Sequence, residues 1–349
     1  MSNVWFIMIA MTRKSMMKSN NKRLQFLDIS KGIGMMMIVW MHIWGNRPNG
    51  FTPPEMLNNF IVSIYVPLFF VLSGYLIKLE FLDIKKEICK KTISLLRPFA
   101  VMYLFSFVSS FFLNVVGFGV KHEFMWDNIF NVVYSKTFFN GPLWFLLSLY
   151  WGFVIFYAII WISRSKEMIM ALLSLVVGCV GFYLHKLDIT LPFFIGPGLV
   201  ASPLLVCGYF TRKYIGNFLI GNRCLTVVTV LVGFAIFATF RTGMSMQNNS
   251  YGGFYLLFLL SVFGGSIMVL SVSMLTERWL SFVGYWGKYS LVVLCFHNFV
   301  LIPIAKIAGV IIHQPIMWAL CTFCIIYAAF LVVIPFISKT CPLFFNIKK

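Results

Sequence analysis

The sequence has too few charged residues for a soluble protein. Only 11% of its 349 residues are Asp, Glu, Lys or Arg, and just 10 of these are acidic. Soluble domains carry about 25% charged residues, which cover a surface that faces water. Hydrophobic residues make up 60% of the chain, so most of the outer surface is expected to face lipid. A soluble fold is therefore excluded, and we predict an all-α, polytopic integral membrane protein.

The hydrophobic residues form runs long enough to cross a lipid bilayer. A membrane-spanning helix needs about 20 mostly apolar residues, and it satisfies its own backbone hydrogen bonds inside lipid. The sequence contains no internal repeat and no polar stretch long enough for a second, soluble domain. We therefore predict one transmembrane domain over residues 23–338, with cytoplasmic tails at 1–22 and 339–349. Ten candidate spans lie at about 26–45, 60–78, 97–118, 143–162, 168–185, 191–210, 224–240, 253–275, 289–312 and 316–337.

The basic residues are distributed as signals of membrane topology. The formal net charge is +18, but Lys and Arg occur in short clusters that form no single face, which argues against nucleic-acid binding. Cytoplasmic loops of membrane proteins carry an excess of Lys and Arg. With the N-terminus in the cytoplasm, 21 of the 28 basic residues are cytoplasmic and five are outside, while Lys31 and Lys306 lie within spans. This distribution predicts that both termini are cytoplasmic.

Two regions depart from a succession of straight spans. Span 191–210 contains Pro192, Pro197 and Pro203 together with several glycines. We therefore expect a kinked or broken helix, which is tolerated at membrane depth only against protein or a water-filled cavity. The outer segment 119–142 mixes aromatic with polar residues. It is expected to lie on the membrane surface or to dip back into the membrane.

The first span carries three ionisable residues, Asp28, Lys31 and His42. A helix turns by about 100° per residue, so Lys31 and His42 lie within about 20° of each other and about 16 Å apart along the axis. The three residues form a polar stripe, with His42 near the outer end. Ionisable residues inside spans are costly and mark functional sites by default. The alternative for Asp28 and Lys31 is a salt bridge that reaches the cytoplasmic interface.

The histidines and cysteines do not form a recognisable metal site. No two histidines have the spacing of metal ligands. Cys321 and Cys324 form a lone C-x-x-C inside an apolar run, without a second pair or a flanking histidine. Two small residues at a helix contact explain this pair. We predict no metal and no tightly bound cofactor.

Six short segments occur in an order that is typical of one family. The segments are R-L-Q-F-L-D-I-S-K-G-I-G with V-W-M-H (23–42), V-P-L-F-F-V-L-S-G-Y-L (66–76), K-K-T-I-S-L-L-R-P (90–98), G-P-L-W-F-L (141–146), L-L-V-C-G-Y-F-T-R-K (204–213) and G-K-Y-S-L-V-V-L-C-F-H (287–297). Together they resemble the acyltransferase type 3 family over nearly the whole chain, and the Lys-Gly form of the first helix is most similar to its fucose 4-O-acetylase-related branch.

The resemblance implies a membrane O-acyltransferase of the bacterial cytoplasmic membrane. Such enzymes transfer an acyl group, usually acetyl from cytoplasmic acetyl-CoA, to a hydroxyl of a cell-surface polysaccharide or a lipid-linked glycan. The resemblance also implies that His42 is the essential histidine, and Asp28 is the second catalytic candidate on its stripe. A neutral imidazole would act as general base; a covalent acyl-histidine is the alternative. Better-known members have Arg at the position of Lys31, and Lys keeps the charge without the bidentate fork.

A cationic cytoplasmic mouth would bind the phosphates of CoA. The candidates are Lys31, Lys90, Lys91 and Arg97, with Ser73 as a neighbour of the donor. For Lys90 and Lys91 the alternative is a purely topological charge. For Ser73 it is a small-residue contact between helices.

Trp144 and His297 are candidates for the acceptor side. Trp144 would stack on a sugar or anchor the helix at the membrane interface, and His297 would be a second essential histidine.

Two other functions remain open. A glycan-lipid transporter or flippase fits the broken span but not the lack of inverted repeats. A non-catalytic subunit of a polysaccharide export complex would need no chemistry at His42.

Overall fold

The computed structural model is helical throughout the residues that it describes. These residues are 24–79, 82–115, 127–136, 140–216, 219–220, 222–241 and 243–345. The only bridge between extended segments among them is an isolated antiparallel one, between Ser245 and Ser250. The all-α fold class is therefore confirmed. The predicted tail at 1–22 lies outside the described residues.

The described residues contain nine helical runs that are long and apolar enough to cross a membrane, or ten when one bent pair is counted as a span. This confirms the polytopic membrane bundle. The nine are α2 (Gln25–Gly45), α3 with α4 (Glu55–Val62, Pro67–Tyr75), α5 with η1 and α6 (Ile84–Lys91, Thr92–Leu96, Arg97–Val115), η2 with α8 (Gly141–Leu143, Trp144–Ser163), α9 (Glu167–Lys186), α13 (Arg223–Phe240), α14 (Tyr255–Leu275), α16 (Ser290–Ile311) and α17 (Pro315–Thr340). The bent pair consists of η3 with α10 (Pro192–Phe194, Ile195–Val200) and α11 with η4 (Ser202–Phe210, Thr211–Gly216). Two shorter helices are α7 (Asp127–Phe130) and α15 (Ser281–Lys288).

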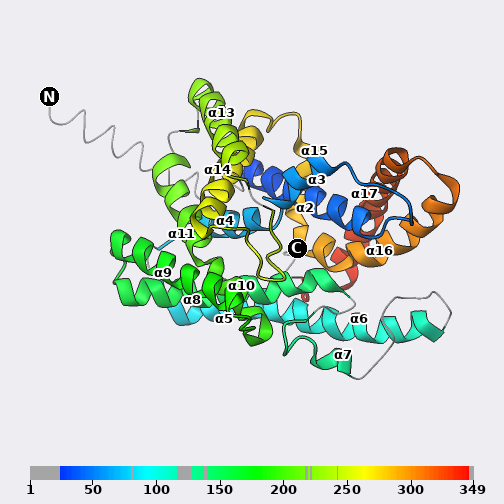
Figure 1. Ribbon diagram of the computed structural model, residues 1–349, viewed down its shortest axis with the longest axis horizontal. Coiled ribbons are helices and arrows are strands. Elements are labelled where there is room, and N and C mark those ends of the chain that lie inside the picture. Colours follow the sequence, from blue (N-terminus) through cyan, green and yellow to red (C-terminus); the bar gives the residue numbers. More distant parts are fainter. Residues whose placement is uncertain are drawn as a thin grey trace.

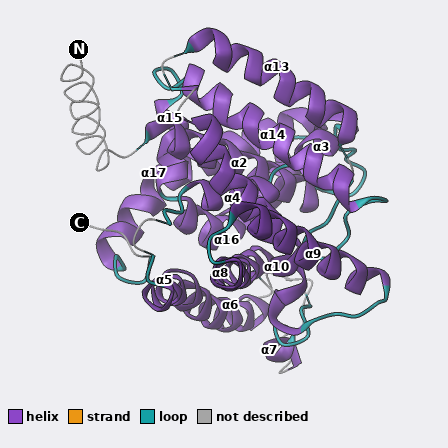
Figure 2. Ribbon diagram, turned by 90° about the vertical axis from the view of Figure 1, so that its left-hand side faces the viewer, coloured by secondary structure: helices purple, strands orange, loops and turns teal. Residues whose placement is uncertain are grey.

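Helix α2 lies in the interior of the bundle. It packs against α14, α15, α16, α17 and α4. Figure 2 shows α13 and α14 at one edge, α5 and α6 at the opposite edge, and α2 between them, while Figure 1 shows the same separation from another side. The helix with the predicted polar stripe is therefore surrounded by protein rather than by lipid.

The sixth span is broken, as the prolines predicted. Its two halves meet at a bend of 43°, and Pro203 stands in the first turn of α11, where a residue without an N–H is tolerated. The hydroxyl of Tyr255 donates to the carbonyl of Val200 at 2.8 Å, and the hydroxyl of Ser202 donates to the carbonyl of Leu199 at 2.8 Å. Both carbonyls at the break thus have partners, as a break at membrane depth requires.

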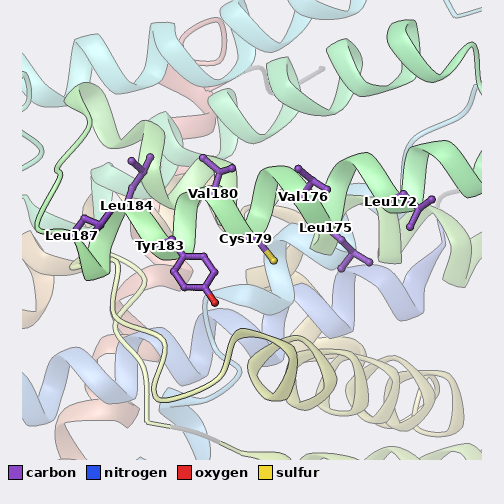
Figure 3. Close-up of a pocket in the computed structure, with 8 residues that line it drawn as sticks. All are labelled: Leu172, Leu175, Val176, Cys179, Val180, Tyr183, Leu184 and Leu187. Atoms are coloured by element: carbon purple, nitrogen blue, oxygen red, sulfur yellow. The ribbon is translucent and has the colours of Figure 1, made fainter.

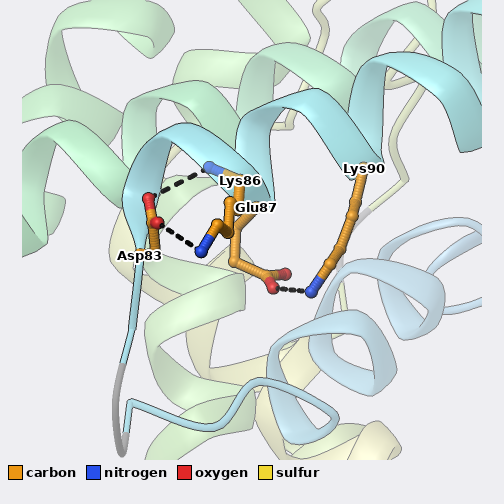
Figure 4. Close-up of polar contacts among 4 residues, drawn as sticks. All are labelled: Asp83, Lys86, Glu87 and Lys90. Atoms are coloured by element: carbon orange, nitrogen blue, oxygen red, sulfur yellow. Dashed lines mark hydrogen bonds and ion pairs between the residues drawn. The ribbon is translucent and has the colours of Figure 1, made fainter.

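The third span begins earlier than the predicted 97, because α5, η1 and α6 form one helical run from Ile84. The carboxylate of Asp83 accepts the backbone N–H of Lys86 at 3.2 Å and so caps the run. This hydrogen bond lowers the pKa of Asp83 below its usual value. Glu87 and Lys90 form an ion pair one turn later (Figure 4). A search for apolar runs misses a helix that begins with a cap and charged pairs.

The described part of the predicted outer segment 119–142 packs against two spans. The hydroxyl of Tyr103 on α6 donates to the carbonyl of Ile129 on α7 at 2.9 Å. The hydroxyl of Ser135 donates to the carbonyl of Leu191 and accepts from the backbone of Phe194, both at 2.7 Å. These bonds tie the segment to the start of the broken span. Residues 119–126 and 137–139 lie outside the described part.

Helix α9 presents an apolar outer face. Figure 3 shows its side chains along a shallow depression that is almost purely apolar. Leu172, Val176 and Tyr183 are each more than half exposed. An exposed apolar stripe of this length is unusual on a soluble monomer, whereas lipid tails would cover it. The face therefore agrees with a membrane-embedded helix.

Glycines let two pairs of helices cross in backbone contact. A Cβ on Gly74 of α4 would overlap the carbonyl of Leu205, and one on Gly208 of α11 would overlap the carbonyl of Val71. Gly287 of α15 approaches the backbone of α2 in the same way. Close approach through small residues is typical of helix packing in membranes. The glycines of three family-like segments are thus explained by packing.

Gly208→Ala is expected to destabilise the protein. The added methyl group meets a backbone carbonyl, which cannot move aside as a side chain can, and overpacking of this kind costs about 1–3 kcal/mol or more. The midpoint of thermal unfolding in detergent should fall clearly. Gly253→Ala is the matched control, because a Cβ there meets no heavy atom within 4 Å. Equal midpoints for the two variants would contradict the crossing.

Candidate functional site

The polar stripe of the first span lies on one continuous helix. Helix α2 runs unbroken from Gln25 to Gly45, so the predicted rotation between Lys31 and His42 holds. Asp28, Lys31 and His42 are all partly buried. At about 1.5 Å per residue, Asp28 stands about 21 Å from His42 along the axis. Asp28 therefore belongs with Lys31 at the first end of α2, away from the imidazole.

Near the C-terminal end of α2, His42 of the polar stripe lies beside a second histidine. The ring of His42 lies beside the ring of His297 on α16, with 5.0 Å between centroids and 49° between planes. His42 is partly buried, whereas His297 is 0% exposed. The two candidates that the sequence placed on spans 1 and 9 are thus brought together, with His42 as the more accessible of the pair.

The contacts of His297 fix which of its nitrogens carries the proton. Its Nδ1 lies 3.0 Å from the carbonyl of Val293 and 2.9 Å from the carbonyl of Leu294. Carbonyl oxygens only accept hydrogen bonds, so Nδ1 must be the protonated donor. Its Nε2 is buried and has no hydrogen-bond partner among the described residues. In a neutral ring this nitrogen carries a lone pair.

A polar cavity of about 230 Å³ is lined by residues from the end of α4, from α5 and from α8. Its polar and charged lining comprises Ser73, Lys78, Glu87, Lys91 and Tyr157. Ser73 and Lys91 were predicted at the donor side, and the structure places both on this cavity. The neighbouring Gly74 makes the helix crossing described above. Ser73 thus lines the cavity, while the small-residue contact of this segment is made by Gly74.

Two further cations stand close to this cavity. The ammonium groups of Lys31 and Lys91 are near enough to interact electrostatically, and Lys91 is held 3.8 Å above the ring of Phe153. The guanidinium of Arg212 donates to the carbonyl of Tyr75 at 3.4 Å. The ring of Tyr75 in turn packs against Phe26 at the start of α2. The start of α2, the end of α4 and the run α5–η1 thus gather positive charge in one place.

The side chains of Lys90 and Arg97 each bind another protein group. Lys90 is exposed and pairs with Glu87 on the surface of α5 (Figure 4). Arg97 donates to the backbone carbonyl of Leu343 in the C-terminal segment. Neither residue lines the cavity. The sequence grouped both with Lys91, and the structure separates them from it.

Trp144 is buried and only 6% exposed. Its ring packs against Phe145 and Phe194, so a sugar would reach it only after one of these rings moves.

The nearby Asn140 was missed by sequence reasoning. Its amide donates to the carbonyl of Cys295 at 2.9 Å and so fastens the start of α8 to the helix that carries His297.

Sequence reasoning did not single out three residues at or beside the cavity, and the sequence offered a different indication for each of them. Lys78 was counted only as a topological charge, and Arg212 lies in a family-like segment, L-L-V-C-G-Y-F-T-R-K. Tyr157 lies among apolar residues of α8, where a single aromatic hydroxyl gives no pattern. Helix packing alone brings Lys78 and Tyr157 to the cavity and Arg212 to the neighbouring end of α4.

The described residues thus form a polytopic membrane bundle with two polar sites, the histidine pair and the cavity. A family model described as an acyltransferase domain matches residues 24–336, from the start of α2 into α17. The chain belongs to the acyltransferase type 3 family and is a membrane acyltransferase. No curated protein and no solved structure matches it significantly.

Proposed function

We propose that the protein transfers an acetyl group from cytoplasmic acetyl-CoA to a hydroxyl of a cell-surface polysaccharide or a lipid-linked glycan. The bacterial cytoplasmic membrane is the proposed location, and the fucose 4-O-acetylase-related branch is the proposed subgroup. One observation carries the proposal. A cavity lined by Lys78 and Lys91 lies close to Lys31 near one end of α2, and His42, paired with His297, lies on the same face of α2 about 16 Å further along the axis.

The cavity suits the phosphate end of the donor. Lys78 and Lys91 line it with positive charge, Lys31 adds charge close to Lys91, and Ser73 and Tyr157 supply hydroxyl groups. Anionic phosphates form strong charge-assisted hydrogen bonds with such groups. At about 230 Å³ the cavity is smaller than the roughly 300–1,000 Å³ of pockets that enclose a whole ligand. It would therefore hold one end of CoA, while the flexible arm extends along α2.

His42 would act on the acceptor hydroxyl as general base. Its neutral imidazole takes the hydroxyl proton while the oxygen attacks the thioester carbonyl. The carbon–sulfur bond breaks, the imidazolium returns the proton to the leaving thiolate, and free CoA and the acetyl ester result. The partial exposure of His42 supports this role, because the base must reach its substrate. Trp144 would guide the acceptor after its aromatic neighbours rearrange.

The broken sixth span also supports a second candidate function, a glycan-lipid transporter. Transporters place broken helices beside their substrate sites. Release of free CoA from acetyl-CoA, measured on purified protein with and without a glycan acceptor, separates the two functions. A transferase releases CoA at a rate that rises with acceptor concentration. A transporter, or a non-catalytic subunit of an export complex, releases none.

The proposed direction of transfer requires a defined topology. Because 21 of 28 basic residues fall on one side and five on the other, both termini are expected in the cytoplasm. Reporter fusions at Lys85 and Arg212 should read inside, and those at Arg47 and Lys186 should read outside. A fusion at Lys349 that reads outside would refute this topology and, with it, a cytoplasmic donor site.

A further inference from the structure

The pairing of the two histidines gives His297 a role that its position in the sequence does not reveal. Its ring is 0% exposed, so a bulky acceptor cannot contact it in this structure. Its Nδ1–H is held by two carbonyls of its own helix. The buried Nε2, which has no hydrogen-bond partner in the described part of the chain, is the one polar atom of this ring left to act. An unpaired buried acceptor is costly unless it acquires a donor.

The ring of His42 lies beside the ring that carries this nitrogen. Two imidazoles with centroids 5.0 Å apart can bring one nitrogen of each within the roughly 2.7–3.2 Å of a hydrogen bond when both nitrogens point along the line between the centroids. No such bond is present in this structure, because Nε2 of His297 has no hydrogen-bond partner among the described residues. Such bonds often tighten only when the substrate is bound.

We propose that His297 is the positioning residue for His42. Its Nε2 lone pair accepts the N–H of His42 and thereby fixes the tautomer in which the other nitrogen of His42 is unprotonated. That nitrogen faces the acceptor hydroxyl and takes its proton. His297 keeps its own Nδ1–H throughout, so no proton passes between the rings. The imidazolium formed on His42 is stabilised by the same hydrogen bond.

This proposal rests on the proposed function and deepens it. It replaces the predicted direct contact of His297 with the acceptor by an action through His42. A comparable partner of a functional imidazole contributes about 10–100-fold to activity. A base held in the wrong tautomer loses more, because it presents a hydrogen where a lone pair is needed.

Two conservative variants separate the two nitrogens of His297. In His297→Asn the amide can donate to the carbonyls of Val293 and Leu294, as Nδ1 does, but nothing replaces Nε2. In His297→Gln the longer amide places a carbonyl oxygen near the position of Nε2, but the contact to the carbonyls is lost. The measurement is kcat and the KM for acetyl-CoA with purified protein and a glycan acceptor.

The expected result is a kcat about 10–100-fold lower in His297→Asn, with the KM for acetyl-CoA unchanged and most of the kcat retained in His297→Gln. The opposite order, with Asn active and Gln inactive, would show that His297 serves only to hold its own helix. That result overturns the proposal.

Nitrogen-15 NMR of imidazole-labelled protein tests the proposal without turnover. The signals of His42 are assigned by their loss in His42→Ala. In the wild-type protein with CoA and a glycan acceptor bound they should show one fixed neutral tautomer. A mixture of tautomers in that complex refutes the proposal even if neither variant at His297 folds. If the wild-type protein transfers no acetyl group, the proposed function fails, while the NMR result still decides whether His297 orients His42.

Discussion

His42→Ala is expected to lower the rate of acetyl transfer by about 10²–10⁴, the usual contribution of a general base. CoA binding should change little, because His42 lies about 16 Å along α2 from Lys31 at the cavity. The loss should therefore appear in kcat and not in the dissociation constant of CoA. Turnover with a glycan acceptor and calorimetric titration of CoA, on the same detergent-purified protein, measure both quantities.

His313→Ala is the matched control for this variant. His313 is exposed in the turn between α16 and α17, so the same substitution there should leave turnover unchanged. Retention of more than about a tenth of wild-type transfer in His42→Ala would contradict the assignment, given an expected loss of 10²–10⁴. A variant that loses only folded yield, with normal turnover per folded molecule, would show that the stripe is structural.

Lys91→Ala is expected to weaken CoA binding by roughly ten- to hundredfold. A hydrogen bond to a charged group contributes about 1.5–3 kcal/mol, and each 1.4 kcal/mol is about a factor of ten in affinity. Lys91 lines the cavity and interacts electrostatically with Lys31, so Lys31→Ala should weaken CoA binding in the same way. Lys31→Arg should be tolerated, because guanidinium matches phosphate geometry. Calorimetric titration of CoA measures these effects.

Lys90→Ala provides a neighbouring control of the same residue type. Lys90 points to Glu87 on the exposed surface of α5, and exposed ion pairs contribute only about 0–1 kcal/mol. CoA affinity should therefore stay close to that of the wild type. Equal losses at Lys90 and Lys91 would mean that the general positive charge of this end, and not the cavity, attracts CoA.

The spans could be predicted because lipid imposes strong rules on sequence. Long apolar runs and prolines within 191–210 were enough to predict the bundle and its broken helix. The start of α5 could not be predicted in this way, since a cap at Asp83 and a charged pair stabilise a helix without any apolar run. Where the charge density rises, hydropathy ceases to distinguish a loop from a polar helix.

The site was predictable only within single helices. The stripe from Lys31 to His42 follows from the helical period, but the contact between His42 and His297 depends on how α2 and α16 pack. Adjacent residues on a helix point about 100° apart, so Lys90 and Lys91 had to diverge. Only the packing of α5 against α8 decides that Lys91, over Phe153, faces the cavity.

The most direct measurement is mass spectrometry of surface glycans from cells that carry the wild-type protein, the His42→Ala variant or no protein. We expect acetylated glycan only with the wild-type protein, and its complete or nearly complete loss in the other two. The variant must be present in the membrane at the wild-type level. Glycan acetylation that persists without the protein, or that His42→Ala fully restores, would contradict transfer of an acetyl group at the histidine end of α2.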